Sequence, residues 1–266
     1  MRPAQAIGPI VLLALAGAAM AESIVLAPMK DNTLYQVDAD SIEVSNGAGW
    51  HLFAGRNSLG TIRRPALAFD IAGQLPAGAI VTAAGLGLHV SLTGSGAQTV
   101  SLHRFLADWG EGASDALGSE GRGAPAEAGD VTWFHRFHPD DPWLQAGGDF
   151  AAAVSASQIV NSVGFYVWND PQLTADVQAW LDDPASNCGW ILRGEEGIPG
   201  MTKRFDSREN PDPQLRPSLW VEYSADTTAV SQSPDGAQPG SWAGLKAIYK
   251  DRTRRPAAAA PGSSRP

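Results

Sequence analysis

Cysteine is nearly absent from this sequence. A single one, Cys188, occurs among 266 residues, and this excludes an intramolecular disulfide. Its surroundings, SNCGWIL, resemble the start of an apolar strand, so we expect the thiol to be buried as a small hydrophobic group. A reactive thiol needs basic neighbours, and only Arg193 is close in sequence. We therefore interpret Cys188 as a structural residue.

Long apolar runs are also lacking. A membrane-spanning helix needs about 20 apolar residues, and no segment reaches that length. The shorter run from Ile10 to Ala16 follows Arg2 and precedes Ala19-Met20-Ala21, which is the pattern of a cleaved signal peptide. We expect residues 1–21 to be removed. The mature protein is then secreted or extracytoplasmic, in the periplasm or at the cell surface, without a membrane span.

Basic residues are few before the C-terminal tail. Residues 22–224 contain 12 Lys/Arg and 25 Asp/Glu, a net charge of −13, whereas residues 225–266 carry a net charge of +3. An acidic body argues against nucleic acid and anionic membranes as the main partners. Neutral ligands and divalent cations remain compatible with it.

Familiar catalytic motifs are missing as well. The sequence has no His-Glu-x-x-His, no P-loop, no nucleotide-binding glycine fingerprint and no cysteine pair. Carboxylates such as Asp140 and Asp141 are adjacent, and adjacent residues of a strand point to opposite faces, so they do not form a glycosidase pair. These absences favour a non-catalytic protein.

Alternation of apolar and polar residues is the main positive signal. It recurs in four segments between turns rich in Gly, Pro, Asp and Asn: RRPALAFDIA, AAGLGLHVSL, NSVGFYVW and PSLWVEY. Repeated period-2 patterning of this kind predicts an all-β fold, specifically an antiparallel β-sandwich. About 200 residues suit one domain, which we place at residues 22–224.

One segment has helical spacing instead. In LTADVQAWLDDP the apolar residues Leu173, Val177, Trp180 and Leu181 recur at intervals of three and four. The pattern predicts a short helix near residues 174–181 with Thr174 as its N-cap and Pro184 as its stop. Trp180 is then a core residue.

The composition changes at Ala225. Residues 225–266 contain a Ser/Gly/Pro-rich linker and a low-complexity end, RRPAAAAPGSSRP, which indicate a flexible tail. Between them, residues 242–249 place Trp242, Leu245 and Ile248 on one helical face. This segment is a candidate docking helix for a protein partner.

The order of these pieces resembles the DNRLRE family of secreted proteins, some of which are classed as carbohydrate-binding modules. The matching phrases are KDNTLY, GRNSLGTIRRPALAFDIAGQLPAGAIVTAAGLGLHV, VSLHRFLADWGEG, VTWFHRF…WLQAGGDF, LTADVQAWLDDPASNCGWILRGEE and KRFDSREN…RPSLWVEY. They cover the mature domain almost from end to end. The resemblance implies a jelly-roll-like β-sandwich that is adhesive or sugar-binding and has no catalysis, although a fold does not fix an activity.

The stretch FDSREN raises a question of role. Arg208 and Glu209 precede a Pro-rich loop, and we interpret them as an ion pair that fixes this loop to the sheet. Contact with a ligand is the alternative. A catalytic role for Ser207 would need a nearby histidine and a sharp Gly-flanked turn, and the sequence shows neither.

Residues 132–149 form the most unusual stretch, and we expect a long loop there. Such loops often carry binding sites. In this interpretation Trp143 stacks on a sugar ring, and the ligand is also contacted by His135, Arg136, His138 and Asp140. In the alternative interpretation Trp133 and Trp143 only cover the end of the sandwich.

Metal binding is a further interpretation of the same loop. His135 and His138, with His103, Asp140 and Asp141 as possible partners, suit zinc or copper. Calcium is a separate candidate cofactor, with oxygens from residues such as Asp31 or Asp149. The sequence does not place a metal site more closely than this.

Three functions follow from these observations. The leading one is a secreted, non-catalytic carbohydrate-binding module that recognises extracellular or cell-wall polysaccharide through residues 132–149. The second is a structural or adhesion protein of the cell surface whose partner is another protein. The third is a metal-dependent enzyme built on the histidines.

Overall fold

The computed structural model describes residues 20–94, 96–118 and 120–225. Residues 226–266 of the expected tail, including residues 242–249, and nearly all of the expected signal peptide lie outside the described residues. Ala225, expected to begin the tail, is instead the last residue of the final strand. The first strand begins at Met20, so its first two residues belong to the segment expected to be removed. The remaining five, from Glu22 to Leu26, each pair with β15.

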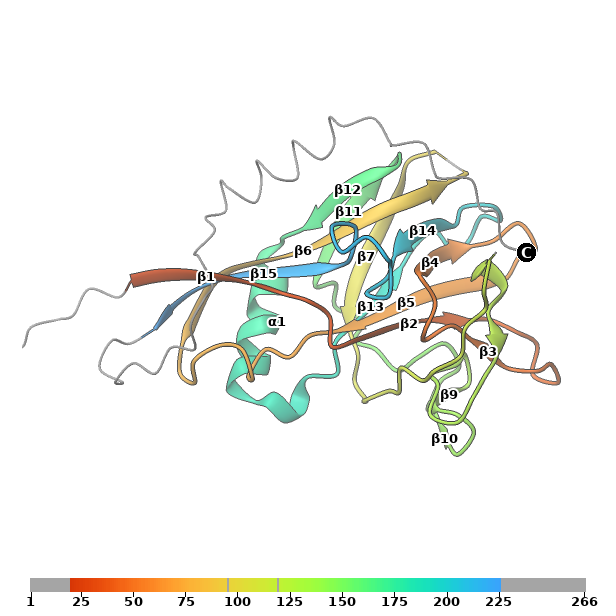
Figure 1. Cartoon of the computed structure of the whole chain (residues 1–266), viewed down its shortest axis with the longest axis horizontal. Coiled ribbons are helices and arrows are strands. Elements are labelled where there is room, and N and C mark those ends of the chain that lie inside the picture. The colour runs from red at the N-terminus through yellow and green to blue at the C-terminus, as the bar shows by residue number, and fades with distance from the viewer. Residues whose placement is uncertain (1–19, 95, 119, 226–266) are drawn as a thin grey trace, which may run out of the picture.

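Antiparallel β-strand is the dominant secondary structure of the described chain, and eleven strands form one large curled sheet (Figure 1). Its hydrogen-bonded order is β1-β15-β6-β14-β4-β5-β13-β7-β11, with β12 added beside β6 and β2 beside β5. These strands are β1 (Met20–Leu26), β2 (Lys30–Tyr35), β4 (His51–Arg56), β5 (Ile62–Ala68), β6 (Ile80–Thr93), β7 (Gln98–Arg104), β11 (Ala156–Val160), β12 (Gly164–Trp168), β13 (Trp190–Arg193), β14 (Lys203–Asp206) and β15 (Ser218–Ala225). All of their pairings are antiparallel.

Short elements complete the structure. Two small two-stranded sheets pair β3 (Val44–Ser45) with β8 (Ala124–Pro125), and β9 (His135–Phe137) with β10 (Asp141–Pro142). The helical elements are α1 (Pro171–Asp182) and the 3₁₀ turns η1 (Glu120–Arg122) and η2 (Pro184–Ser186). The expected all-β fold with one short helix is therefore confirmed.

The main core lies inside the curled sheet. It joins the inward side chains of β4, β6, β14 and β15 to those of β5, β7, β11 and β13, and α1 contributes its apolar face. On β6 the alternation places Leu86, Leu88, Val90 and Leu92 on one side; the first three are completely buried, whereas Leu92 is 55% exposed, beyond a register shift in the pairing with β14. Such burial of alternate residues on both halves of the sheet is the stabilising principle of a β-sandwich.

The helix begins earlier than the spacing predicted. Its N-cap is Asp170 rather than Thr174, and Pro171 stands in the first turn, where a missing N–H costs nothing. The Thr174 hydroxyl instead accepts a hydrogen bond from the Ala84 N–H of β6, at 3.1 Å. The helix ends at Asp182, just before Pro184, as predicted. Trp180 is buried as expected.

A second apolar cluster lies beneath residues 105–150, on the outer side of β2, β5 and β13. It consists of Leu34, Ala66, Ala68, Phe105, Trp109, Val131, Trp133, Trp143 and Ile191. Cys188 packs against this cluster and is partly buried, and burial raises the pKa of its thiol. These contacts agree with a structural cysteine.

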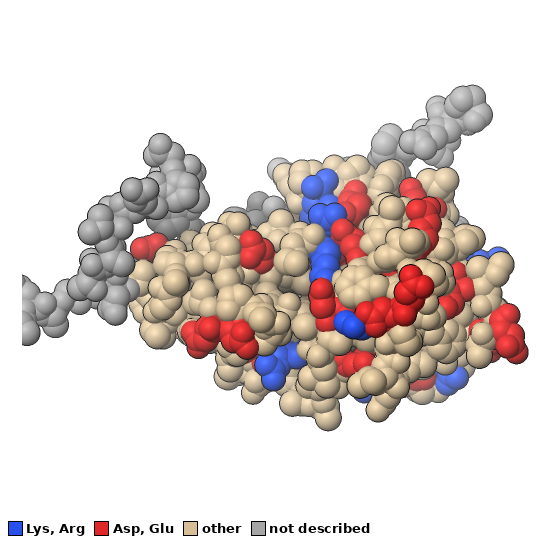
Figure 2. Space-filling view, turned by 90° about the horizontal axis from the view of Figure 1, so that it is seen from below, with Lys and Arg blue, Asp and Glu red and all other residues tan. Residues whose placement is uncertain are grey.

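Charge is unevenly spread on the face that carries β9 and β10. Figure 2 shows scattered acidic groups there and a narrow row of basic groups across the middle. No helix within the described ranges is long and apolar enough to cross a membrane.

Candidate functional site

The structure contradicts the prediction that Trp143 is an exposed ligand-binding residue. Its side chain is only 6% exposed, and its ring stacks on Phe105 with centroids 5.4 Å apart and planes 8° apart. The indole N–H donates to the Thr132 carbonyl at 3.1 Å. Trp143 is therefore not an exposed platform for sugar. Apolar burial explains the difference, since both Trp143 and Trp133 belong to the second cluster.

The other four predicted contacts separate into two groups. Arg136 forms an ion pair with Asp141, with 2.6 Å between Nη2 and Oδ2. Asp140 is exposed beside this pair. His135 and His138, in contrast, turn toward the body of the protein. The five residues expected to form one ligand surface therefore do not converge.

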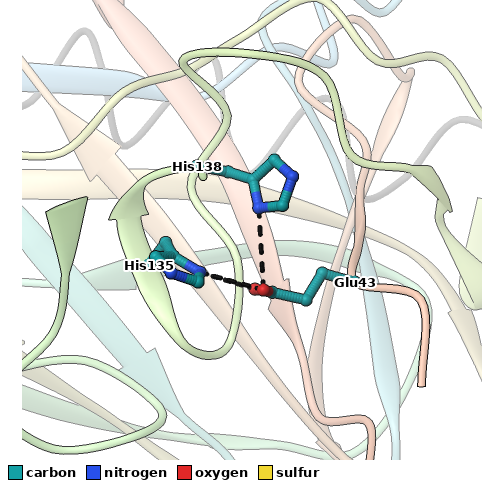
Figure 3. A group of neighbouring side chains, drawn as sticks. All are labelled: Glu43, His135 and His138. Carbon is teal, nitrogen blue, oxygen red and sulfur yellow. Dashed lines mark hydrogen bonds and ion pairs between the residues drawn. The ribbon is translucent and has the colours of Figure 1, made fainter. Parts of the chain in front are cut away.

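His135 and His138 meet Glu43, which precedes β3 and lies 92 residues before His135 in the sequence (Figure 3). The His135 Nδ1 lies 2.9 Å from Glu43 Oε1, and the His138 Nδ1 lies 3.6 Å from the same oxygen. The two imidazole rings are nearly perpendicular, with centroids 5.4 Å apart. Two nitrogens and a carboxylate oxygen thus converge on a small volume.

Backbone hydrogen bonds place these three side chains. The Thr132 N–H donates to the His135 carbonyl, and the His138 N–H donates to the Asp130 carbonyl, both at 2.8 Å. On the other side, the Ala126 N–H donates to the Glu43 carbonyl at 2.9 Å. The Thr132 hydroxyl also donates to the Glu43 carboxylate. The cluster is held by the loop itself and by the strand pair β3–β8.

His103 is not part of this cluster, which corrects its expected partnership with His135 and His138. It lies on β7, where its Nδ1 contacts the Ala151 carbonyl at 2.9 Å and its Nε2 contacts Ser101 Oγ at 3.1 Å. Burial lowers the pKa of the His103 imidazole despite the contact with the Ala151 carbonyl.

A surface cavity of about 450 Å³ opens beside His103 and the end of the 132–149 segment, and we name it the Phe150 cavity. Its lining residues are His103, Leu106, Ala107, Leu144, Gln145, Gly148, Asp149, Phe150, Ala152 and Arg193. It therefore combines a partly exposed aromatic ring with hydrogen-bonding side chains. The Asp149 carboxylate accepts from the backbone N–H groups of Leu144 and Gln145 at 2.8 and 2.9 Å and so fixes the rim.

Glu196 organises the arginines next to the Phe150 ring. Its carboxylate accepts two hydrogen bonds from Arg64, at 2.8 and 2.9 Å, and one from Arg193 at 2.9 Å. Burial alone would raise the pKa of Glu196, but the hydrogen bonds and charges of these arginines lower it below its usual value. Both guanidinium groups also lie within 5.5 Å of the Phe150 ring centre.

The Ser-Arg-Glu stretch contains the expected ion pair and more. The Arg208 Nε lies 2.7 Å from Glu209 Oε1, and Arg208 also bonds both oxygens of Glu111, at 2.6 and 2.9 Å. Its backbone N–H donates to the buried carboxylate of Asp31 at 2.8 Å. The contacts tie the loop before β15 to β2 and to the segment at residue 111.

Three carboxylates crowd around this one arginine. Oxygens of Asp31, Glu111 and Glu209 lie within 4.8 Å of one another. Burial and the nearby charge of Glu209 raise the pKa of Asp31 well above its usual value, although the bond from the Arg208 N–H acts in the opposite direction. Burial also raises the pKa of Glu209.

Sequence patterns did not predict that His51 on β4 and His89 on β6 meet Asp206 on β14 at the outer face of the sheet. The His89 Nδ1 lies 2.5 Å from one oxygen of Asp206, and the His51 Nε2 lies 3.6 Å from the other. The His51 Nδ1 in turn lies 3.2 Å from Glu120. His89 stood on the polar side of the β6 alternation, but no spacing in the sequence brings it to residues 51 and 206.

The comparisons with known proteins add no assignment to this geometry. No protein-family model matches the chain, and a search of curated proteins finds no match.

Proposed function

We propose that the protein is a secreted, non-catalytic carbohydrate-binding module for extracellular or cell-wall polysaccharide, and that sugar binds in the Phe150 cavity. The observation that carries the proposal is this cavity of about 450 Å³, which combines an aromatic ring with hydrogen-bonding side chains. Cavities of roughly 300–1,000 Å³ suit small organic ligands. The resemblance to the DNRLRE family and the N-terminal pattern of a signal peptide support the same class.

The lining favours a neutral sugar unit. Phe150 offers an apolar surface to the C–H groups of a sugar ring, while Gln145 and Arg193 are placed to bond hydroxyls. The Glu196 carboxylate already pairs with Arg193, which reduces the attraction of the site for an acidic sugar. The net charge of −13 over residues 22–224 acts in the same direction.

Calcium enters this proposal as a candidate structural ion. The carboxylates of Asp31, Glu111 and Glu209 offer the oxygen ligands that calcium prefers. Arg208 already bonds two of these groups, so calcium would have to displace its guanidinium.

The test is a glycan array with the purified protein, run once with calcium and once with a chelator. We expect binding to a neutral polysaccharide. The substitution Gln145→Ala, combined with Arg193→Ala, should weaken it about 10-fold or more through two lost hydrogen bonds. The matched control is Gln74→Ala, because Gln74 is exposed and lies outside the cavity lining.

Two results would count against the proposal. Glycan binding that survives the double substitution places the sugar site elsewhere on the protein. Absence of binding to every glycan under both conditions favours the structural or adhesion alternative.

A further inference from the structure

We propose that Glu43, His135 and His138 bind one zinc ion and leave a fourth coordination position open to water. The three residues share no member with the lining of the Phe150 cavity, so this site stands or falls independently of the proposed function.

The donor atoms carry the argument. Two imidazole nitrogens and one carboxylate oxygen form the donor set found in many zinc sites that keep an open position. Calcium and magnesium prefer oxygen alone, so the two histidines argue against both. The neutral imidazoles and one carboxylate leave a net positive charge on the bound metal, which suits an acidic protein body.

The spacing of the donors fits zinc. Bonds of about 2.0–2.1 Å in a tetrahedron place neighbouring donor atoms about 3.3 Å apart. The two distances between histidine Nδ1 and Glu43 Oε1 are 2.9 and 3.6 Å, on either side of this value. The donor atoms of all three residues lie within 4.8 Å of one another. Small side-chain rotations would therefore be enough to admit the ion.

A buried nitrogen without a hydrogen-bond partner also supports a bound zinc ion. The His138 Nδ1 is buried and has no hydrogen-bond partner within the described residues. At 3.6 Å it is too far from Glu43 Oε1 for a hydrogen bond. Buried polar atoms usually have a partner, and a metal bond would supply one here.

The surroundings meet the remaining needs of a metal site. The Thr132 hydroxyl donates to the second oxygen of Glu43 and so orients the carboxylate, as supporting groups around metals do. The three side chains are 15–23% exposed, which leaves a route for the ion from solvent. The His135 Nδ1 already lies toward Glu43, and when this nitrogen binds zinc the neutral ring carries its proton on Nε2.

The experiment is zinc binding to the untagged protein by calorimetry, with metal content measured after dialysis. We expect one zinc per chain at micromolar free metal. His135→Gln, His138→Gln and Glu43→Gln should each weaken binding about 100-fold or more, since even loss of a supporting group costs up to about 100-fold. The matched control is His89→Gln, which removes a histidine outside both the cluster and the Phe150 cavity and should leave the zinc affinity unchanged.

Cobalt substitution tests the geometry separately. Co²⁺ in the wild-type protein should give the strong visible absorption of four-coordinate cobalt, and Glu43→Gln should abolish it. The weak spectrum of six-coordinate cobalt would overturn the tetrahedral zinc site. Wild-type protein without bound zinc, or zinc binding that all three substitutions leave intact, would overturn the proposal as a whole. These wild-type measurements decide it even where a variant fails to fold.

Discussion

At the scale of single residues, Asp31 is a carboxyl group that is buried close to the charge of Glu209. Burial and the charge of Glu209 raise the pKa of its carboxyl, so the folded protein holds a proton there more tightly than the unfolded chain does. A raised carboxyl pKa stabilises the fold most at low pH. That contribution is lost as the pH rises from the unfolded pKa, near 4, through the folded pKa.

Asp31→Asn should remove this loss. An amide keeps an oxygen that can accept from the Arg208 N–H, and it carries no charge at any pH. Relative to wild type, the free energy of unfolding of Asp31→Asn should rise as the pH increases from the unfolded pKa, near 4, through the folded pKa of Asp31. Urea denaturation across this range measures it. The exposed Asp38 supplies the control, and equal pH dependence of Asp31→Asn and wild type would contradict the prediction.

At the scale of elements, Trp133 and Trp143 flank the β9–β10 hairpin and pack it against the second apolar cluster. Trp143→Ala would remove a buried ring stacked on Phe105 and the hydrogen bond to Thr132. We expect a loss of about 3–5 kcal/mol in the free energy of unfolding, the usual cost of truncating a buried aromatic side chain. Chemical denaturation measures this loss.

The control for this element is Trp50→Ala, because Trp50 is 47% exposed. A surface substitution of this kind should change the free energy of unfolding by no more than about 0.5 kcal/mol. Equal stability of Trp143→Ala and Trp50→Ala would mean that Trp143 is free to serve as a binding surface after all.

Two strands and Trp143 show what the sequence can and cannot predict. Alternation along β6 predicted the strand and the burial of Leu86, Leu88 and Val90, because period 2 is a local property of the chain, but it wrongly placed Leu92 among them. In the segment NSVGFYVW, which contains β12, the alternation was equally clear. It did not predict that Trp168 is buried and that Val163, just before the strand, is exposed. The role of Trp143 was similarly undecided, since a tryptophan serves equally well in a core and on a binding face.

The candidate metal cluster depends on contacts between distant parts of the chain. The spacing of His135 and His138 suggested a metal site, but Glu43 became a partner only through the pairing of β3 with β8. His103 was the wrong third residue because β7 carries it to the Phe150 cavity instead. Distant partners of this kind follow from topology and leave no local pattern in the sequence.

At the scale of the whole molecule, two sets of carboxyls oppose each other in acid. The arginines beside Glu196 outweigh its burial and lower its pKa, and hydrogen bonds from His51 and Asn46 do the same for Glu120 despite its burial. A lowered carboxyl pKa contributes stability above the unfolded pKa, and this contribution is lost as the pH falls through the folded pKa. Asp31 and Glu209, with raised pKa values, act in the opposite sense.

The stability of the protein should therefore peak at mildly acidic pH. As the pH falls through the raised pKa values of Asp31 and Glu209, their protonation favours the folded state. Below about pH 4, the ion pairs of Glu196 and the hydrogen bonds to ionised Glu120 are lost and stability declines. The substitution Glu196→Gln tests the contribution of Glu196 to this loss of stability in acid. It should lower the free energy of unfolding at pH 7, and the difference from wild type should disappear near pH 3. The exposed Glu127 provides the matched control, Glu127→Gln, which should follow the wild-type curve throughout. A Glu196→Gln curve that runs parallel to wild type down to pH 3 would show that its pairs with Arg64 and Arg193 contribute nothing to the folded state.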